Sequence, residues 1–387
     1  MQLSIIIVSY NVRALLAQCI ASIEAAGKGL EYEIIVVDNN SKDDSFPYFT
    51  KKETGVKFIW NKENLGFAKA NNLGLLVARG DYILFLNPDT VLTQDSLRQC
   101  LDHLTTTPNC GALGVHMIDG VGNYLSESKR FVPGLLASVF YFSGISKLVK
   151  NSKFFNAYHA GNIDKNQRSE VPILSGAFMM ASVGIMKEAG GFDPRYFMYA
   201  EDVDLSMSIE KLGYKNWYLV DVKIVHYKGE SSIIKDDTYY QRFFSAMKIF
   251  VKKYNGKIAA FLKSLLIDMT HLIFKVKNQL AVKSSEADVF KVHHNVAVFC
   301  SSEERELIRL LNQKYGFAKN IIFIEGAATI PGETTAVIYS TTSVSFTNII
   351  DKISNSHSDI ASYIFNDSTK TLIGSNGKLA AAIVFTL

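Results

Sequence analysis

The chain has 387 residues, enough for two domains or for one large domain with an appendix. Hydrophobic residues make up 48% and charged residues 20%, so we expect a folded core. The net charge of +4 does not suggest a nucleic-acid-binding protein. The four cysteines are scattered without a Cys-x-x-Cys pair, which gives no zinc or disulfide framework and fits a reducing compartment.

Apolar strands alternate with amphipathic helices along the first half of the chain. The expected strands are residues 3–11, 32–41, 56–64 and 81–90, and the expected helices are residues 12–27 and 66–80. Unbroken runs of Val, Ile and Leu between such helices predict a mostly parallel sheet with both faces covered, as in a doubly wound α/β domain. The N-terminus has no basic segment or cleavage site, so we interpret it as the first strand and not as a signal peptide.

Residues 171–214 and a strand pair that ends at His226 complete this domain, which we bound at residues 1–240. Residues 286–387 have three strand-like runs and one helical run, and they are expected to form a small α/β module of unknown role. The module lacks Gly-x-Gly-x-x-Gly after its first strand, which argues against a dinucleotide site there.

A basic amphipathic helical segment is expected over residues 241–285, between these two parts. Its helical pattern places four polar residues along one narrow stripe of an otherwise apolar surface: Ser264, Asp268, His271 and Lys275. Charged residues interrupt the apolar run, so a helix that spans a bilayer is not expected. Two alternatives remain: a helix that lies in the membrane surface, or a helix packed on the main domain or on another subunit.

Polar residues follow each strand of the predicted sheet. They are Ser9, Tyr10 and Asn11 after the first strand; Asp38, Asn39, Asn40 and Ser41 after the second; Asn64 and Gly66 after the third; and Asn87 and Asp89 after the fourth. In doubly wound sheets, ligands bind outside the carboxyl ends of the strands, so these residues indicate a binding site. Each one alone is better explained by a turn or a helix N-cap, but four strands that end in the same way favour a binding site.

Two groups of side chains have the chemistry of a catalytic site. Asp89 and His226 end separate strands, and oxygen ligands with one imidazole suit Mg²⁺ or Mn²⁺ better than zinc. His226 alone is better explained as a strand-end histidine bonded to backbone. Glu201, Asp202 and Asp204 open a helix, where crowding raises carboxyl pKa values and allows one acid to act as a general base. An acidic helix N-terminus favoured by the helix dipole is the alternative.

Seven segments resemble, in their order, the motifs of inverting family 2 glycosyltransferases, and above all the rhamnosyltransferase-like branch that builds bacterial surface polysaccharides. They read "SIIIVSYN", "IIVVDNNSKDDS", "NLGFAKANNLG", "YILFLNPDT", "SGAFMM", "GGFDPRYFMYAEDVDL" and "HYKGES", and together they cover about residues 3–250. The resemblance implies a GT-A fold, which is a Rossmann-like α/β fold with a mostly parallel sheet. It also implies a nucleotide-diphosphate sugar donor and a divalent metal, Mg²⁺ or Mn²⁺.

The resemblance also implies roles for individual residues. The nucleotide-sugar site would comprise Ser9, Tyr10, Asn11, Asp38, Asn40, Asn64, Gly66, Lys69, Asn71 (or Asn72) and Asn87. The metal would be bound by Asp89 and His226, the catalytic residues would be Asp202 as the base with Glu201 beside it, and the acceptor site would include Gly176, Ala177 and Asp204. Asn87 departs from the wider family, which has an aspartate at this position.

The expected function is metal-dependent transfer of a sugar, with inversion, from dTDP-rhamnose or a UDP-sugar to a lipid-linked saccharide. We expect a cytosolic protein in peripheral contact with the inner face of the plasma membrane. Residues 131–148 are expected to form an apolar lip near the acceptor site. The sequence leaves open whether the protein forms an oligomer. One alternative is a catalytically silent nucleotide-sugar-binding or scaffold protein. A sugar nucleotidyltransferase is disfavoured, because the first loop has no glycine-rich basic sequence.

Overall fold

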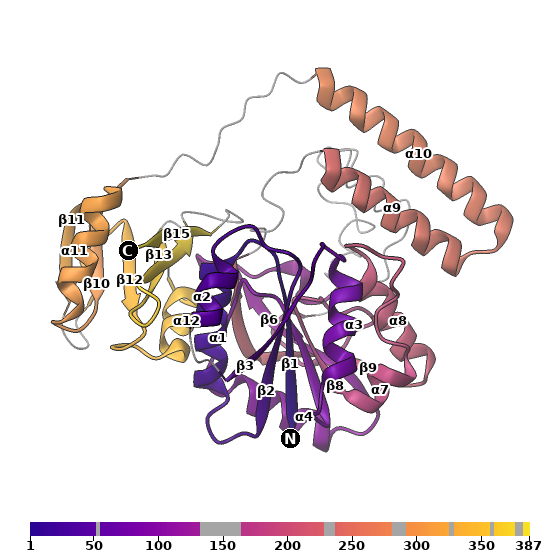
Figure 1. Cartoon of the computed structure of the whole chain (residues 1–387), viewed down its shortest axis with the longest axis horizontal. Coiled ribbons are helices and arrows are strands. Elements are labelled where there is room, and N and C mark those ends of the chain that lie inside the picture. The colour runs from indigo at the N-terminus through magenta and orange to yellow at the C-terminus, as the bar shows by residue number, and fades with distance from the viewer. Residues whose placement is uncertain are drawn as a thin grey trace.

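The computed structural model describes residues 1–51, 55–131, 164–227, 237–280, 292–324, 329–356, 360–375 and 382–387. These residues form two β-sheets, each with helices packed on it, and a pair of long helices that lies on the far side of the first sheet from the second sheet (Figure 1). The α/β fold class with a second, smaller sheet module, predicted from the sequence, is therefore confirmed.

The first sheet has nine strands. They are β1 (Leu3–Ser9), β2 (Tyr32–Asp38), β3 (Val56–Trp60), β4 (Tyr82–Leu86), β5 (Thr90–Leu92), β6 (Cys110–Ile118), β7 (Ser169–Glu170), β8 (Phe178–Ser182) and β9 (Lys215–His226). The order is β3-β2-β1-β4-β8-β6-β9-β5, with β7 paired to β9. The neighbours β3, β2, β1 and β4 are parallel, whereas β8 is antiparallel to β4 and to β6.

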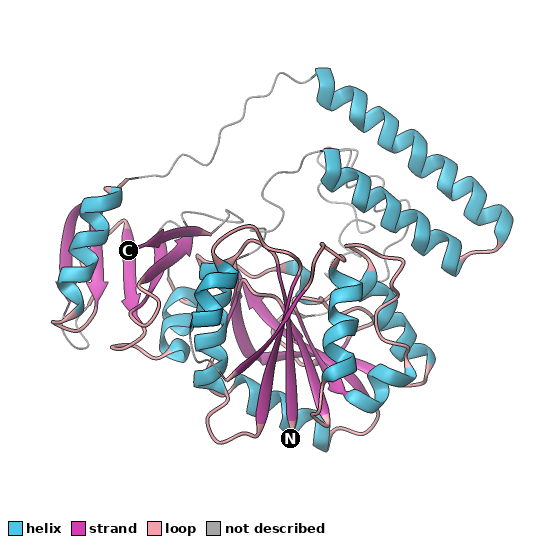
Figure 2. Cartoon of the chain, viewed as in Figure 1, coloured by secondary structure: helices cyan, strands magenta, loops and turns pink. Residues whose placement is uncertain are grey.

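Helices cover both faces of this sheet, as Figure 2 shows by colour. They are α1 (Arg13–Ala26), α2 (Ser45–Lys51), α3 (Phe67–Val77), α4 (Ser96–Thr106), α7 (Val183–Glu188) and α8 (Glu201–Lys211), with a short 3-10 turn, η1 (Ser126–Ser128). Successive residues of β1 explain the two layers: Ile5 and Ile7 belong to the core under α1 and α4, and Ile6 to the core under α3 and α8. A strand buried on both faces needs an unbroken apolar run, as the sequence has.

The strand pair expected to end at His226 is a single strand of 12 residues, β9. β9 stays in the sheet through a register shift against β6, where the pairing steps from Val115 with Leu219 to His116 with Lys223. An irregularity of this kind lets a long strand bend without leaving the sheet. The expectation of two strands was therefore wrong, because residues 220–222, which the register shift skips, stay within β9.

Two long helices follow the first sheet: α9 (Asp237–Tyr254) and α10 (Lys257–Leu280). They lie side by side in Figure 1, and α9 joins them to the first sheet through buried Ala246. No helix among the described residues is both long enough and apolar enough to span a membrane.

The second sheet has the order β11-β10-β12-β13-β14-β15. Its strands are β10 (His293–Phe299), β11 (Ala318–Ile324), β12 (Ala336–Ser340), β13 (Ala361–Asn366), β14 (Thr371–Ser375) and β15 (Ile383–Thr386), and its helices are α11 (Glu304–Tyr315) and α12 (Phe346–Ser354). The first four strands in this order are parallel, and the last two pairings are antiparallel.

The two sheets share a hydrophobic core. Val91 and Val225 of the first sheet lie in one buried cluster with Ile349, Ile350 and Ile353 of α12. The backbone N–H of Gln94 donates to the hydroxyl of Thr347, also in α12, at 2.9 Å. The second sheet is therefore attached to the first by packed apolar side chains and not only by the chain that connects them.

Gly122 marks the closest approach of the two parts and gives a matched test. It has φ of +89°, and a Cβ there would lie 2.2 Å from the carbonyl oxygen of Ile353, whereas at Gly213, with φ of +92°, a Cβ would meet nothing within 4 Å. Replacement by alanine at either site should lower the free energy of unfolding by about 1–2 kcal/mol, because the backbone is left-handed there. Gly122→Ala should lower it by about 1–3 kcal/mol more, because the new Cβ clashes with the carbonyl oxygen of Ile353. Chemical denaturation of both variants measures the difference, and equal losses would contradict the contact.

Candidate active site at the rim of the first sheet

The candidate site lies where the chain reverses direction across the first sheet. After β1 the chain moves to β2 on one side, and it later returns to β4 on the other side, so the loops after β1 and β4 diverge. Such a reversal leaves a crevice at the carboxyl ends of the strands. Ser9 ends β1 directly beside Asp38, which ends β2, and the hydroxyl of Ser9 is buried with no hydrogen-bond partner among the described residues.

A network of polar contacts fixes the loops after β1 and β2. Asp38 is 2% exposed and accepts hydrogen bonds from the N–H (2.8 Å) and the hydroxyl (2.6 Å) of Ser41. That hydroxyl also accepts from the N–H of Asn11 at 2.9 Å, and Asn11 accepts from the N–H of Lys42 at 2.6 Å. Burial raises the pKa of Asp38. The two loops are thereby held as one unit, and Tyr10 at the end of β1 is exposed.

Two asparagines occupy left-handed backbone positions in these loops, Asn11 with φ of 57° and Asn40 with φ of 66°. Asparagine tolerates this region better than most residues, which explains its use here. Asn40 also donates to the carbonyl of Lys62 at 2.9 Å and accepts from Lys42 at 2.8 Å. Both asparagines therefore have structural roles at the rim in addition to any binding role.

The third group of predicted residues surrounds the start of α3. Gly66 has φ of +81°, its N–H donates to the side chain of Asn64 at 3.0 Å, and a Cβ there would lie 2.4 Å from the carbonyl oxygen of Phe197. Lys69 is exposed, and Asn71 is buried and donates to the carbonyl of Phe67 at 3.0 Å.

The alternative to Asn71 has a different role. The side chain of Asn72 donates to the carbonyl of Phe192 at 2.7 Å and accepts from its N–H at 3.0 Å, so it ties α3 to the loop before α8.

The turn after β4 places an amide, a carboxylate and an imidazole together. Oδ1 of Asp89 lies 3.3 Å from Nε2 of His226, and the side-chain nitrogen of Asn87 lies 3.4 Å from the same ring nitrogen. Both Asp89 and His226 are 7% exposed. The pairing of β5 with β9 brings them together, since Thr90 is opposite His226. No group of three or more His, Cys, Asp or Glu arranged to hold a metal ion occurs in the described ranges.

The acids at the start of α8 follow two residues with left-handed backbone, Tyr199 (φ 74°) and Ala200 (φ 63°). Such positions cost about 1–2 kcal/mol each for residues other than glycine, so the surrounding structure must hold them. Glu201 is 7% exposed, and burial together with the charge of Asp202 raises the pKa of Glu201 to about 8. Glu201 is therefore mainly protonated at neutral pH.

Asp202 has a different environment from its neighbour. Its carboxylate forms an ion pair with Arg130, accepts from the N–H of Gly176 at 3.1 Å, and accepts from the N–H of Val203 at 2.8 Å. A carboxylate has about four lone-pair positions, so these three donors leave one of them for a further donor.

A backbone contact joins the two groups of candidate residues. The N–H of Asn87 donates to the carbonyl of Ala177 at 3.0 Å, and the adjacent Gly176 donates to Asp202. The turn that holds Asp89 and the helix that begins with the acids therefore meet at the same rim of the sheet.

Asp204 does not join this group. It is 2% exposed, pairs with Lys253 of α9 at 2.8 Å, and accepts from the hydroxyl of Tyr254 at 2.8 Å. It thus fixes α9 to α8, because the helix turns this third acid toward α9. Its place in the acceptor site stays a prediction from the family resemblance.

Arg130 was missed by sequence reasoning. It follows no motif, and the chain brings it to Asp202 through a bridge between Arg130 and Ile173, whose backbone groups exchange hydrogen bonds of 3.1 and 3.2 Å. Asn39 was noted as a polar residue after β2, but its role was not: its side chain donates to the carbonyl of Gly66 at 3.2 Å and accepts from Asn61 at 2.9 Å.

Comparison with known proteins bears on this site. The model of the family described as "Glycosyl transferase family 2" matches residues 4–189, which include most of the rim. Residues 4–189 are a glycosyltransferase family 2 domain. This confirms the family predicted from the motifs, and it favours a glycosyltransferase over a catalytically silent binding protein.

Curated relatives of this glycosyltransferase act in bacteria. One is the N-acetylglucosaminyl-diphospho-decaprenol L-rhamnosyltransferase of Mycobacterium tuberculosis, 27% identical over 241 residues, which cover 59% of this chain and 77% of the relative. Another is the poly-beta-1,6-N-acetyl-D-glucosamine synthase of Staphylococcus aureus, 25% identical over 188 residues, or 48% of this chain and 40% of that protein.

Solved structures are more distantly similar. The mannosyltransferase PcManGT of Pyrobaculum calidifontis, in complex with GDP-Man and Mn²⁺, has a TM-score of 0.45 and 17% identity, and the match covers 73% of this chain and 76% of that one. For TarS 1–349 of S. aureus the TM-score is 0.42 and the identity 17%, with 74% and 76% covered. Scores this low support no argument about the site.

The raised pKa of Glu201 predicts a pH dependence of stability. The pKa is 4.5 in an unfolded chain and about 8 when folded, so the folded state holds a proton between these values that the unfolded state releases. The free energy of unfolding should therefore fall as pH rises through this window, by up to about 1.4 kcal/mol per pH unit. In Glu201→Gln the free energy of unfolding, measured by chemical denaturation, should depend less on pH in this window. In Glu188→Gln, which changes an exposed residue, it should fall with pH as in the wild-type protein. A parallel decline in both variants would contradict the assignment.

Proposed function

We propose that this glycosyltransferase transfers a sugar, with inversion, from dTDP-rhamnose or a UDP-sugar to a lipid-linked saccharide in bacterial surface polysaccharide synthesis. One observation supports this most strongly: Asp202 is held at the same rim as Asn87, Asp89 and His226 through the hydrogen bond from Asn87 to Ala177. The relative from M. tuberculosis, named for L-rhamnose transfer to an N-acetylglucosaminyl-diphospho-decaprenol, supports the choice of donor and acceptor.

The nucleotide would bind at the ends of β1 and β2. The buried carboxylate of Asp38 and the hydroxyl of Ser9 offer polar contacts to a base and a ribose, and the loops around them are cross-linked before any ligand arrives. A preorganised site loses less conformational entropy on binding. Asn64 and Lys69 would lie along the ribose and the diphosphate, as the family resemblance implies.

The side chains at the turn after β4 fit a divalent cation. The carboxylate of Asp89 lies 3.3 Å and the amide of Asn87 lies 3.4 Å from the same imidazole nitrogen of His226, so they supply two ligands and one neighbouring donor. Mg²⁺ is commonly held by one or two carboxylates, with the remaining positions left for water and substrate phosphates. Asp89 and His226 would therefore hold Mg²⁺ or Mn²⁺, which would neutralise the charge of the leaving diphosphate.

Asp202 is the proposed general base. Its carboxylate takes the proton from an acceptor hydroxyl, whose oxygen bonds to the anomeric carbon while the bond from that carbon to the diphosphate oxygen breaks. Attack from the side opposite the diphosphate inverts the configuration. Arg130 and the N–H of Gly176 orient the carboxylate. General-base catalysis of this kind accelerates a reaction about 10²–10⁴-fold. Glu201, mainly protonated, adds no second negative charge beside the base.

Asp202→Asn should abolish transfer and leave donor binding nearly unchanged, because the amide keeps the shape but cannot take the proton. The measurement is transfer from dTDP-rhamnose or a UDP-sugar to a lipid-linked N-acetylglucosamine with Mn²⁺ or Mg²⁺, together with calorimetric donor binding. We expect a loss of at least about 10²-fold in turnover. Asp102→Asn, the same change at an exposed position of α4, is the control. Near-normal turnover of Asp202→Asn would exclude it as the base.

The helix α10 supports the membrane contact that we propose for this enzyme. Two residues of its polar stripe contact α9: Asp268 pairs with Lys248, and the ring of His271 stacks on Phe244 with centroids 4.8 Å apart. The surface of α10 away from α9 exposes seven large apolar side chains at helical spacing: Ile258, Phe261, Leu262, Leu265, Leu266, Met269 and Leu272.

An anionic membrane surface would match this helix. Exposed Lys257 and Lys275 lie on α10 itself, and exposed Lys252 lies on α9. Apolar side chains combined with lysines are what bind a helix into the plane of an anionic bilayer. The apolar lip expected at residues 131–148 lies outside the described residues, apart from Phe131.

Phe261→Glu should weaken binding to anionic vesicles about tenfold or more, because one buried aromatic side chain contributes about 1.5–3 kcal/mol. Flotation with phosphatidylglycerol vesicles measures the bound fraction. Leu76→Glu, at an 81% exposed position of α3, is the matched control and should bind as wild type. The proposal fails if the wild-type protein stays unbound at low salt, or if both variants bind alike.

A further inference from the structure

The second sheet has a chain reversal of the same kind as the first. β11 and β12 lie on either side of β10, so the loops that leave β10 and β12 diverge at the carboxyl edge. The helices that follow them cover opposite faces: Ile308 of α11 packs with Val298, and Ile349 of α12 packs with Ala297. Loops that diverge in this way leave a crevice between them, which is where open α/β sheets bind their ligands.

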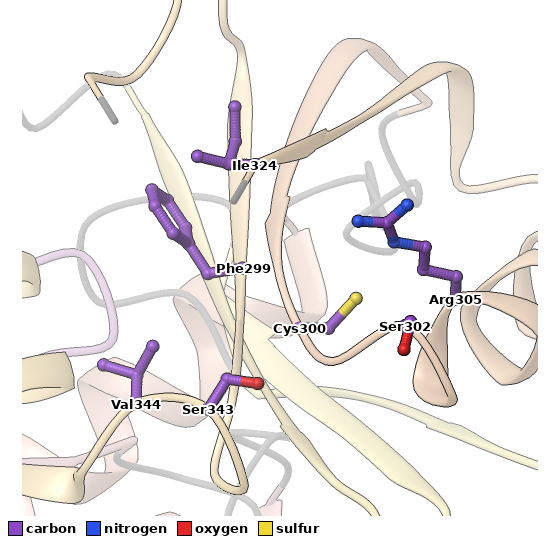
Figure 3. A pocket seen from close by; sticks show the side chains of 7 residues that line it. All are labelled: Phe299, Cys300, Ser302, Arg305, Ile324, Ser343 and Val344. Carbon is purple, nitrogen blue, oxygen red and sulfur yellow. The ribbon is translucent and has the colours of Figure 1, made fainter. Parts of the chain in front are cut away.

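A cavity of about 340 Å³ occupies this position. Phe299 ends β10, Ile324 ends β11, and Val344 follows β12, and these three side chains form one side of the cavity in Figure 3. Cavities that bind small molecules begin at about 300 Å³, so the volume suits a small ligand with an apolar or ring-shaped part.

Polar side chains form the other side of the same cavity. They are the guanidinium of Arg305, the hydroxyl of Ser302 and the thiol of Cys300, whereas the hydroxyl of Ser343 lies beside Val344 (Figure 3). The guanidinium of Arg305 lies 5.3 Å from the centre of the Phe323 ring, which helps to hold it in place. The guanidinium of Arg305 and the hydroxyl of Ser302 offer donors to the oxygens of one phosphate group.

The loop between β10 and α11 limits how many phosphates can bind. It contains no glycine that would let a diphosphate approach the backbone. Glu304 is 3% exposed in the first turn of α11, and its carboxylate accepts from the hydroxyl of Ser340 at 2.5 Å and from the N–H of Ser301 at 2.9 Å. This carboxylate already takes up two donors beside the cavity, the N–H of Ser301 and the hydroxyl of Ser340, which leaves fewer donors for a second phosphate.

We propose that the second sheet binds a small organic monophosphate in this cavity, with the phosphate on Arg305 and Ser302. The organic part lies against Phe299, Ile324 and Val344. This site is separate from the donor site of the transferase, because its lining residues all come from the second sheet and its loops.

Cys300 gives a local measurement of binding. Cys19, Cys100 and Cys110 are buried, whereas Cys300 is only half-buried and lines the cavity. Burial raises the pKa of Cys300 to about 11, so its reaction with N-ethylmaleimide is slow enough to follow by peptide mass spectrometry. AMP, UMP or glucose 1-phosphate should slow this reaction in the full chain, and adenosine, uridine and glucose should not.

Two arginines of α11 provide a matched pair of variants. Both guanidiniums lie over the Phe323 ring, at 5.3 Å for Arg305 and 5.2 Å for Arg309, but only Arg305 lines the cavity. Arg305→Gln should raise the ligand concentration needed for protection about tenfold, since a charge-assisted contact is lost. Arg309→Gln should leave it unchanged.

Three results would overturn the proposal. The first is that none of the three monophosphates protects Cys300 from N-ethylmaleimide, and the second is that adenosine, uridine or glucose protects it equally well. The third is that Arg305→Gln and Arg309→Gln need the same ligand concentration for protection. Asp89→Ala, which alters the first sheet, should keep the protection of Cys300. Its loss in that variant would assign the effect to the donor site and would also overturn the proposal.

Discussion

The burial of β1 and β4 on both faces is the constraint on which the rest of the site depends. Ile5, Ile6, Leu84 and Phe85 are fully buried, and helices pack on either side of them. No polar group can lie along such strands without losing its hydrogen bonds to water. Carboxylates and amides are therefore confined to the strand ends, where the hydrogen bond from Asn87 to Ala177 brings the two groups of candidate residues together.

Two adjacent acids show how this rim separates chemical roles. Glu201 is buried and has a raised pKa, whereas Asp202 is surrounded by Arg130 and backbone donors. The left-handed backbone at Tyr199 and Ala200 sets this arrangement, because it turns the chain into α8 just before the acids.

Much of this arrangement could be predicted from the sequence, because it depends on local patterns. Unbroken apolar runs gave the strands, and the residues after them gave the rim, including Asp89 and His226. Arg130 could not be predicted, since its partner Asp202 is brought close only by the fold. The orientation of Asp204 toward Lys253 was missed for the same reason. The polar stripe of α10 was recognised, but its pattern could not reveal that Asp268 and His271 contact α9 while the apolar surface stays exposed.

The long strand β9 has a consequence for how this protein can be divided. The family match ends at residue 189, yet β9 lies inside the first sheet between β6 and β5, and the second sheet packs behind it through Val225. A fragment cut at the end of the family match would leave β6 with β8 but without β9, and β5 without any partner strand. The segment that the family model matches is thus shorter than the unit that folds, and expression of that segment alone would yield a sheet with an exposed edge that is prone to aggregate.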